Sequence, residues 1–108
     1  MDRVAEGSGP RALVWRLEDM KHAGPGALDA LADLLEEIRG SAGLREPKRG
    51  TFYRRSSAFL HFHEDPAGLF ADLKISDTFH RFPVNTAMER RALLRRIAQL
   101  TRDDRRPS

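Results

Sequence analysis

The chain has 108 residues, of which 40% are hydrophobic and 32% are charged, and its formal net charge is +3. This composition provides one modest hydrophobic core beneath a highly charged surface. Because the chain has no cysteine, disulfides, thiolate metal sites and cysteine nucleophiles are excluded. The sequence has no apolar run of membrane-spanning length and no signal-peptide-like start, so we expect a cytoplasmic protein that does not contact membranes.

The expected organisation is one α+β domain at residues 12–104, between flexible tails at residues 1–11 and 105–108. Residues 12–22 carry leucines at helical spacing, which favours a helix, although the run "ALVWRL" (12–17) also fits a strand. Residues 27–39 carry an apolar stripe at i, i+3, i+7 and i+10 that begins at Leu28. This stripe predicts an amphipathic helix, which Gly40 then ends.

Strands are expected at residues 51–55, 58–63 and 69–75, with a fourth at residues 79–84. Between the second and third, Asp65-Pro66-Ala67-Gly68 has the residue order of a type I turn. A final helix begins at Thr86, which forms a capping-box pattern with Glu89. The expected fold is therefore α+β: an antiparallel meander of three to four strands, with N-terminal helices and a C-terminal helix packed on one face.

The strand register predicts two different sheet faces. If residues 65–68 form the loop, His61 pairs with Asp72, and the side chains of each strand alternate between the faces. One face is then apolar, and it consists of Leu60, Phe62, Leu69, Ala71, Leu73 and Ile75, with Tyr53 from the first strand. The opposite face consists of Phe59, His61, His63, Phe70, Asp72 and Lys74, with Phe52 and Arg54 from the first strand.

The aromatic content of the second face predicts a covered surface, because a merely solvated face does not need three phenylalanines. We therefore expect a non-catalytic binding or interaction domain without a cofactor. Its partner would be a protein, a small-molecule ligand or a second copy of the chain. The binding residues would be Phe52, Arg54, Phe59, His61, His63, Phe70 and Asp72.

An alternative function is that of a metal-dependent or acid–base enzyme using His61, His63 and Asp72. A His-x-His pair on a strand points both imidazoles the same way, and zinc accepts imidazole and carboxylate ligands. The stretch "HFHEDP" resembles the His-x-His-x-Asp-His signature of metallo-β-lactamase-fold hydrolases. Pro66 replaces the closing histidine, and the chain is too short for that fold, so this family is rejected.

A second alternative is single-stranded nucleic-acid binding by the same face. The stretch "RSSAFLHF" (55–62) resembles the second half of the RNP1 box of RNA-recognition motifs, whose aromatic residues stack on bases. Ser56 and Ser57 replace the glycine and the aromatic residue of that box. Arg91, Arg95 and Arg102 would add a basic stripe on the last helix.

A broader resemblance covers roughly residues 27–75. A helix, a strand with a phenylalanine, a His-x-His pair and a following Leu-x-x-Asp are similar to a small bacterial domain family catalogued as a "luciferase domain". The matching residues are Phe52, His61, His63, Leu69 and Asp72. The tryptophan-containing C-terminal part of that family is replaced here by "FHRFPVNT". The resemblance implies that His61, His63 and Asp72 act together, and it implies neither light emission nor an oxidation.

Overall fold

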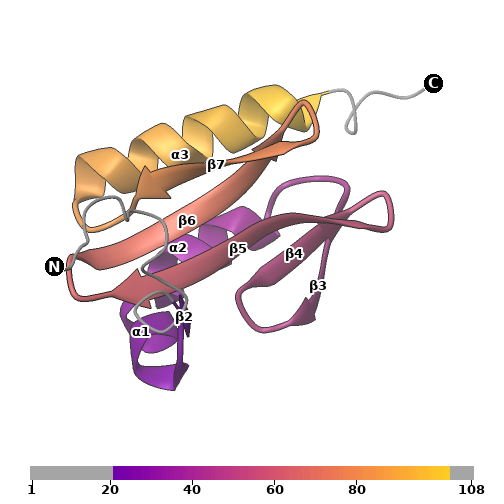
Figure 1. The fold of residues 1–108 in the computed structure, drawn as a ribbon. Coiled ribbons are helices and arrows are strands. Elements are labelled where there is room, and N and C mark those ends of the chain that lie inside the picture. The colour runs from indigo at the N-terminus through magenta and orange to yellow at the C-terminus, as the bar shows by residue number, and fades with distance from the viewer. Residues whose placement is uncertain (1–20, 103–108) are drawn as a thin grey trace, which may run out of the picture.

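The computed structural model describes residues 21–102, and it has the expected α+β architecture (Figure 1). The elements, in chain order, are β2 (Lys21–His22), α1 (Pro25–Ala30), α2 (Ala32–Arg39), β3 (Leu44–Lys48), β4 (Thr51–Arg54), β5 (Ser57–Asp65), β6 (Gly68–Ile75), β7 (Thr78–Pro83) and α3 (Ala87–Leu100). Both expected tails and most of the segment 12–22 lie outside the described residues. The helix expected at the end of that segment is wrong, because Lys21–His22 form a strand.

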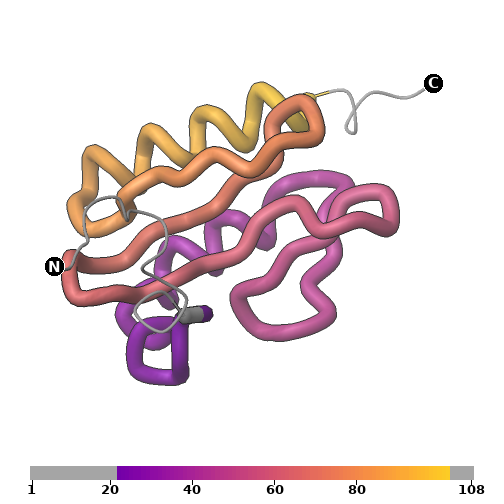
Figure 2. The backbone as a smooth tube through the Cα atoms, viewed as in Figure 1, coloured from indigo at the N-terminus to yellow at the C-terminus, as the bar shows by residue number. Residues whose placement is uncertain are grey.

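The sheet is an antiparallel meander of five strands in the order β3-β4-β5-β6-β7, and not of three or four. Figure 2 shows how the backbone of this region turns back on itself from one strand to the next. The additional strand is β3, whose sequence "LREPK" contains charged residues and a proline. Such a strand has no apolar alternation. At a sheet edge the proline is tolerated because one side of the strand needs no backbone donors, and the charged side chains discourage pairing with another chain. The short β2 pairs with β5 beyond the end of β4, since Thr51 of β4 lies opposite His61 and His22 lies opposite His63.

The predicted helix at 27–39 is present as two consecutive helices, α1 and α2, separated at Leu31. Pro25 stands in the first turn of α1, where its missing N–H costs nothing. The capping box of α3 is confirmed: the Glu89 amide donates to Thr86 Oγ1 at 3.1 Å, and the Thr86 amide donates to Glu89 Oε1 at 3.1 Å. These two bonds satisfy backbone amides that a helix N-terminus otherwise leaves without partners.

The helices lie together on one face of the sheet, which gives the domain two layers (Figure 1). Burying apolar side chains between the layers is the main stabilising term of such a fold. The buried core consists of Leu28, Leu31, Leu34, Leu35, Ile38, Phe52, Phe59, Leu60, Phe62, Ala71, Leu73, Val84, Leu93 and Ile97. None of the helices within residues 21–102 has the length and apolar character needed to cross a membrane.

The predicted register of the hairpin β5–β6 is confirmed, with His61 opposite Asp72 and Leu60 opposite Leu73. Leu60, Phe62, Ala71 and Leu73 are buried beneath the helices, so the apolar alternation identified the core face correctly. The two strands approach the turn more closely than expected, because Asp65 and Gly68 also pair. The Ala67 amide donates to Asp65 Oδ1 at 2.7 Å and closes this turn.

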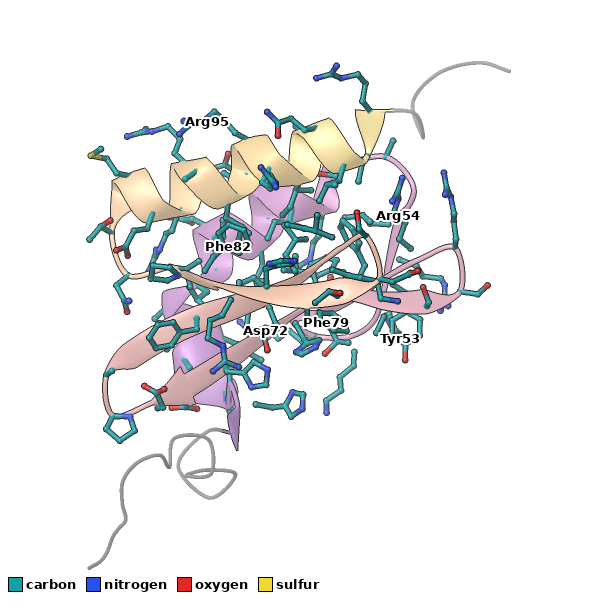
Figure 3. The ribbon with its side chains drawn as sticks, turned by 45° about the horizontal axis from the view of Figure 1, so that its top comes forward. Tyr53, Arg54, Asp72, Phe79, Phe82 and Arg95 are labelled. Atoms are coloured by element: carbon teal, nitrogen blue, oxygen red, sulfur yellow. The ribbon has the colours of Figure 1, made fainter. Side chains whose placement is uncertain are left out.

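The assignment of β4 to the two faces is wrong, because a β-bulge interrupts its pairing with β5. Phe52 lies opposite Leu60 and Tyr53 lies opposite Ala58, so Phe59 is an extra residue on β5. Phe52 and Phe59 are therefore both core residues, with exposed fractions of 1% and 2%. Figure 3 shows Arg54 on the helix side of the sheet, and Tyr53 on the opposite side.

Glu46 links α2 to the β3–β4 hairpin, and we expect it to make the stability of the domain depend on pH. Its carboxylate accepts hydrogen bonds from Arg39 Nε at 2.6 Å, Arg39 Nη2 at 3.0 Å and the Gly50 amide at 2.9 Å. The hydrogen bonds from Arg39 are the main reason that the pKa of Glu46 is lowered; burial opposes them, and the Gly50 amide lowers the pKa further. The resulting stabilisation is fully present above about pH 4.3, the usual pKa of an unfolded glutamate, and is lost as the pH falls through the lower folded-state pKa.

Urea unfolding of the native protein and of Glu46→Gln, at pH 7 and pH 3, measures this contribution. The native protein should be the more stable at pH 7, and the difference should shrink at pH 3. Glu36→Gln is the matched control, since Glu36 contacts the same Arg39 at 3.2 Å but its side chain is 78% exposed. A Glu36→Gln variant as destabilised at pH 7 as Glu46→Gln would contradict the special role of Glu46.

Candidate metal-binding site on the open sheet face

The sheet face opposite the helices carries a group of titratable and aromatic side chains, and we call it the open face. Strand alternation and cross-strand pairing place on it Tyr53, His61, His63, Phe70, Asp72, Lys74, Phe79 and Arg81, together with His22 of β2. Figure 3 shows Tyr53, Asp72 and Phe79 on this side, and Phe82 between the sheet and α3. None of the described helices covers this face.

Three of the chain's four histidines form a cluster on the open face. One ring nitrogen each of His22, His61 and His63 lies within 4.8 Å of the other two. The ring of His63 lies 4.9 Å from each of the other two rings, measured between centroids. His61 and His63 are half-buried and His22 is exposed, so the cluster is accessible from the side of His22.

The backbone positions His22 beside the other two histidines. His22 is the direct cross-strand partner of His63 in the β2–β5 pair, which puts both side chains on the same face of the sheet. The segment after it is held by two further bonds: the Ala23 amide donates to the Phe62 carbonyl at 3.0 Å, and the Gly24 amide donates to Glu64 Oε2 at 2.7 Å. A two-residue strand has no periodicity, so sequence reasoning missed His22.

Asp72 adjoins the cluster through His63 and is held in place by Arg81. Arg81 Nε and Nη2 donate to the two carboxylate oxygens of Asp72, both at 2.8 Å. Asp72 Oδ2 also lies 3.0 Å from His63 Nε2. Burial alone would raise the pKa of the Asp72 carboxyl, but hydrogen bonds from Arg81 and His63 outweigh it and hold this pKa well below its usual range. Asp72 is therefore a fixed negative charge behind the histidines.

The hydrogen bonds among the described residues do not give every ring nitrogen of the cluster a partner of its own. His63 Nε2 lies 2.9 Å from His61 Nδ1 and 3.0 Å from Asp72 Oδ2, so in the tautomer with its proton at Nε2, that single proton faces two acceptors. His63 Nδ1 is buried and has no hydrogen-bond partner within residues 21–102. Buried polar atoms without a partner are uncommon in native proteins, and the explanations for them include a bound water or ion.

The electrostatics of the cluster keep His61 neutral over a wider range of pH. Burial lowers the pKa of His61, and the neighbouring rings of His63 and His22 lower it further, against the opposing effect of Asp72. A neutral imidazole has a free lone pair, which is the form that binds metal ions. Burial and mutual repulsion therefore disfavour protonation of His61, which is the step that competes with metal binding.

The spacing of the nitrogens is close to that of a metal site. A tetrahedral zinc ion with Zn–N bonds of about 2.0–2.1 Å separates its ligand atoms by about 3.3 Å. In the cluster, one nitrogen of each ring lies at most 4.8 Å from one nitrogen of each of the other two. Small rotations of the side chains, above all of the exposed His22, would bring three nitrogens around one ion.

The structure brings together only part of the predicted site. His61, His63, Phe70 and Asp72 share the open face, whereas Phe52, Arg54 and Phe59 lie on the helix side. Two neighbours of the histidines come from β7 and were not predicted. Phe79 packs 4.9 Å from the ring of His61, and Arg81 is the cross-strand partner of Asp72. Arg95 of the predicted basic stripe points away from the sheet, on the far side of the molecule (Figure 3).

Comparison of the chain with protein-family models, curated proteins and solved structures finds no match in any of the three. The resemblance to the "luciferase domain" family stays a prediction. A function is therefore inferred from the geometry of the open face.

Proposed function

We propose that this domain binds a divalent transition-metal ion of the zinc class through His22, His61 and His63. The observation that carries the proposal is the convergence of three imidazole nitrogens within 4.8 Å of one another on an accessible sheet face. Imidazole is a good ligand for zinc, copper, nickel and iron, and three histidines are a common donor set for zinc. The site is proposed as a binding site, and no reaction is assigned to it.

Asp72 supports this proposal as an orienting group. Histidines that bind metals usually donate their second ring N–H to a carboxylate or a carbonyl, which fixes the ring and makes it a better ligand. Asp72 Oδ2 lies 3.0 Å from His63 Nε2, so with this nitrogen donating to Asp72, His63 would bind the metal through Nδ1, which has no partner among the described residues. Arg81 holds the carboxylate by two hydrogen bonds. The carboxylate, the imidazole and the metal would then lie in the carboxylate–histidine–metal order that is common in zinc sites.

A zinc titration of the full chain tests the proposal. Calorimetry should show one site per chain, and NMR of the imidazole rings should show three histidines shifting while the fourth, His80, does not. His80 is the internal control because it lies opposite Leu73, whose side chain is in the core, and hence on the helix side of the sheet. Absence of zinc binding, or equal shifts of all four rings, would refute the site.

Asp72→Asn should weaken zinc binding by about 10- to 100-fold, the range found when an outer partner of a metal-binding histidine is removed. The substitution removes the negative charge beside His63 and breaks the ion pair between Asp72 and Arg81. Zinc calorimetry measures the effect.

Asp77→Asn is the matched control for this substitution. Asp77 is exposed in the turn between β6 and β7, with a positive φ that asparagine tolerates. An unchanged zinc affinity in Asp72→Asn, or an equal loss in Asp77→Asn, would show that Asp72 does not orient the cluster.

A further inference from the structure

The coordination sphere offered by the described residues is incomplete, and this determines what else the site can bind. Three histidines supply three ligands, whereas a zinc-class ion takes at least four. The nearest carboxylate, Asp72, is already engaged by Arg81 through both of its oxygens. If the proposed metal binds, a fourth position is left for a molecule from outside the described chain.

The surroundings of this position are aromatic on one side. Phe79 and Met88 are the two large hydrophobic side chains that are exposed among residues 21–102, and their exposed fractions are 40% and 76%. Met88 is on α3, far from the cluster, but Phe79 is on the open face with its ring 4.9 Å from the ring of His61. An exposed aromatic ring beside a group of metal ligands is a surface on which another flat ring can stack.

The charge of the surroundings is positive. A bound divalent cation would add to Lys74, whose ammonium lies 5.7 Å from the centre of the Phe79 ring. Lys74 and Phe79 are direct cross-strand partners, which keeps the ammonium over the Phe79 ring on the open face. A ligand that reaches both the metal and Phe79 therefore gains from carrying a negative oxygen donor at one end and a flat ring at the other.

We propose that the metal-loaded site binds an aromatic carboxylate, whose carboxylate takes the fourth position on the metal and whose ring stacks on Phe79. This inference rests on the proposed metal site and adds the chemical class of its ligand. Phe79 has the role of a specificity-determining residue: it does not hold the metal, and it selects the ring.

The test uses the full chain loaded with cobalt(II), whose visible absorption reports on its ligands. Benzoate should change this spectrum and bind about tenfold more tightly than acetate, since an added aromatic pair contributes up to about tenfold in affinity. In Phe79→Ala the affinity for benzoate should fall to that for acetate, with cobalt uptake unchanged. In Met88→Ala, which removes the other large hydrophobic side chain that is exposed among residues 21–102, the preference for benzoate should remain.

The outcomes separate this inference from the proposed function. If cobalt does not bind, the metal site itself is refuted, and the inference is refuted with it. If cobalt binds but benzoate leaves the spectrum unchanged, the inference alone is refuted. If benzoate binds equally well to the native protein and to Phe79→Ala, or no better than acetate, the aromatic selection is refuted. Circular dichroism of both variants checks that the fold is retained.

Discussion

Replacing His22 by glutamine should weaken zinc binding by more than about 100-fold, which exceeds the loss expected for an outer partner of a metal ligand. His22 supplies one of the three nitrogens of the cluster, and a two-histidine site would remain without it. Because His22 is exposed and belongs to a two-residue strand, the metal-free variant should be as stable as the native protein. Zinc calorimetry and thermal unfolding with and without zinc measure both effects.

Zinc should also stabilise the native fold, and this stabilisation should disappear in His22→Gln. A ligand present at 100 times its dissociation constant adds about 2.7 kcal/mol to the free energy of unfolding. The matched control is His80→Gln, which removes the histidine on the helix side of β7. If His80→Gln loses as much zinc affinity as His22→Gln, the cluster is not the binding site.

The same variant tests whether zinc fastens β2 to β5. The amides of Ala23 and Gly24 donate to β5, to the Phe62 carbonyl and to the Glu64 carboxylate. Because the proposed metal would bridge His22 to the histidines of β5, zinc should slow hydrogen exchange at these two amides in the native protein. It should have no such effect in His22→Gln. Equal exchange with and without zinc in the native protein would show that the metal does not tie the strands together.

The part of the site on β5 and β6 could be predicted from the sequence because two independent signals agree there. The apolar alternation of Leu60, Phe62, Ala71 and Leu73 allows one register, and the Asp65-Pro66 turn allows the same one. A slip by one residue would have placed charged side chains in the core. His61 and Asp72 therefore followed correctly from the pattern of their neighbours.

The other parts of the site lacked such a signal. His22 reaches the cluster through a strand of two residues, in which no periodicity can be seen. Phe59 is the extra residue of a β-bulge, and a bulge reverses the alternation of everything that follows on the paired strand. A strict period of two then assigns Phe52 and Arg54 to the wrong face, and it places Tyr53 in the core instead of on the open face.

Replacing Phe52 by alanine should therefore destabilise the domain by about 3–5 kcal/mol, the range for removing a buried aromatic side chain. Phe52 is 1% exposed and packs in the core between the sheet and the helices. Alanine in its place loses the transfer free energy of the ring and leaves a cavity in a close-packed core. Urea unfolding followed by circular dichroism measures the change in the free energy of unfolding.

Phe79→Ala is the matched control, since it removes the same side chain from the open face of the same sheet. Phe79 has 40% of its surface exposed. Its replacement by alanine should lower the free energy of unfolding by no more than about 1–1.5 kcal/mol, because it removes less buried area and leaves no closed cavity. Strict alternation from β5 would place Phe52 beside the histidines, and the two variants would then be similarly stable. A cost for Phe52→Ala no larger than that for Phe79→Ala would therefore contradict the β-bulge and the division of the sheet into a core face and an open face.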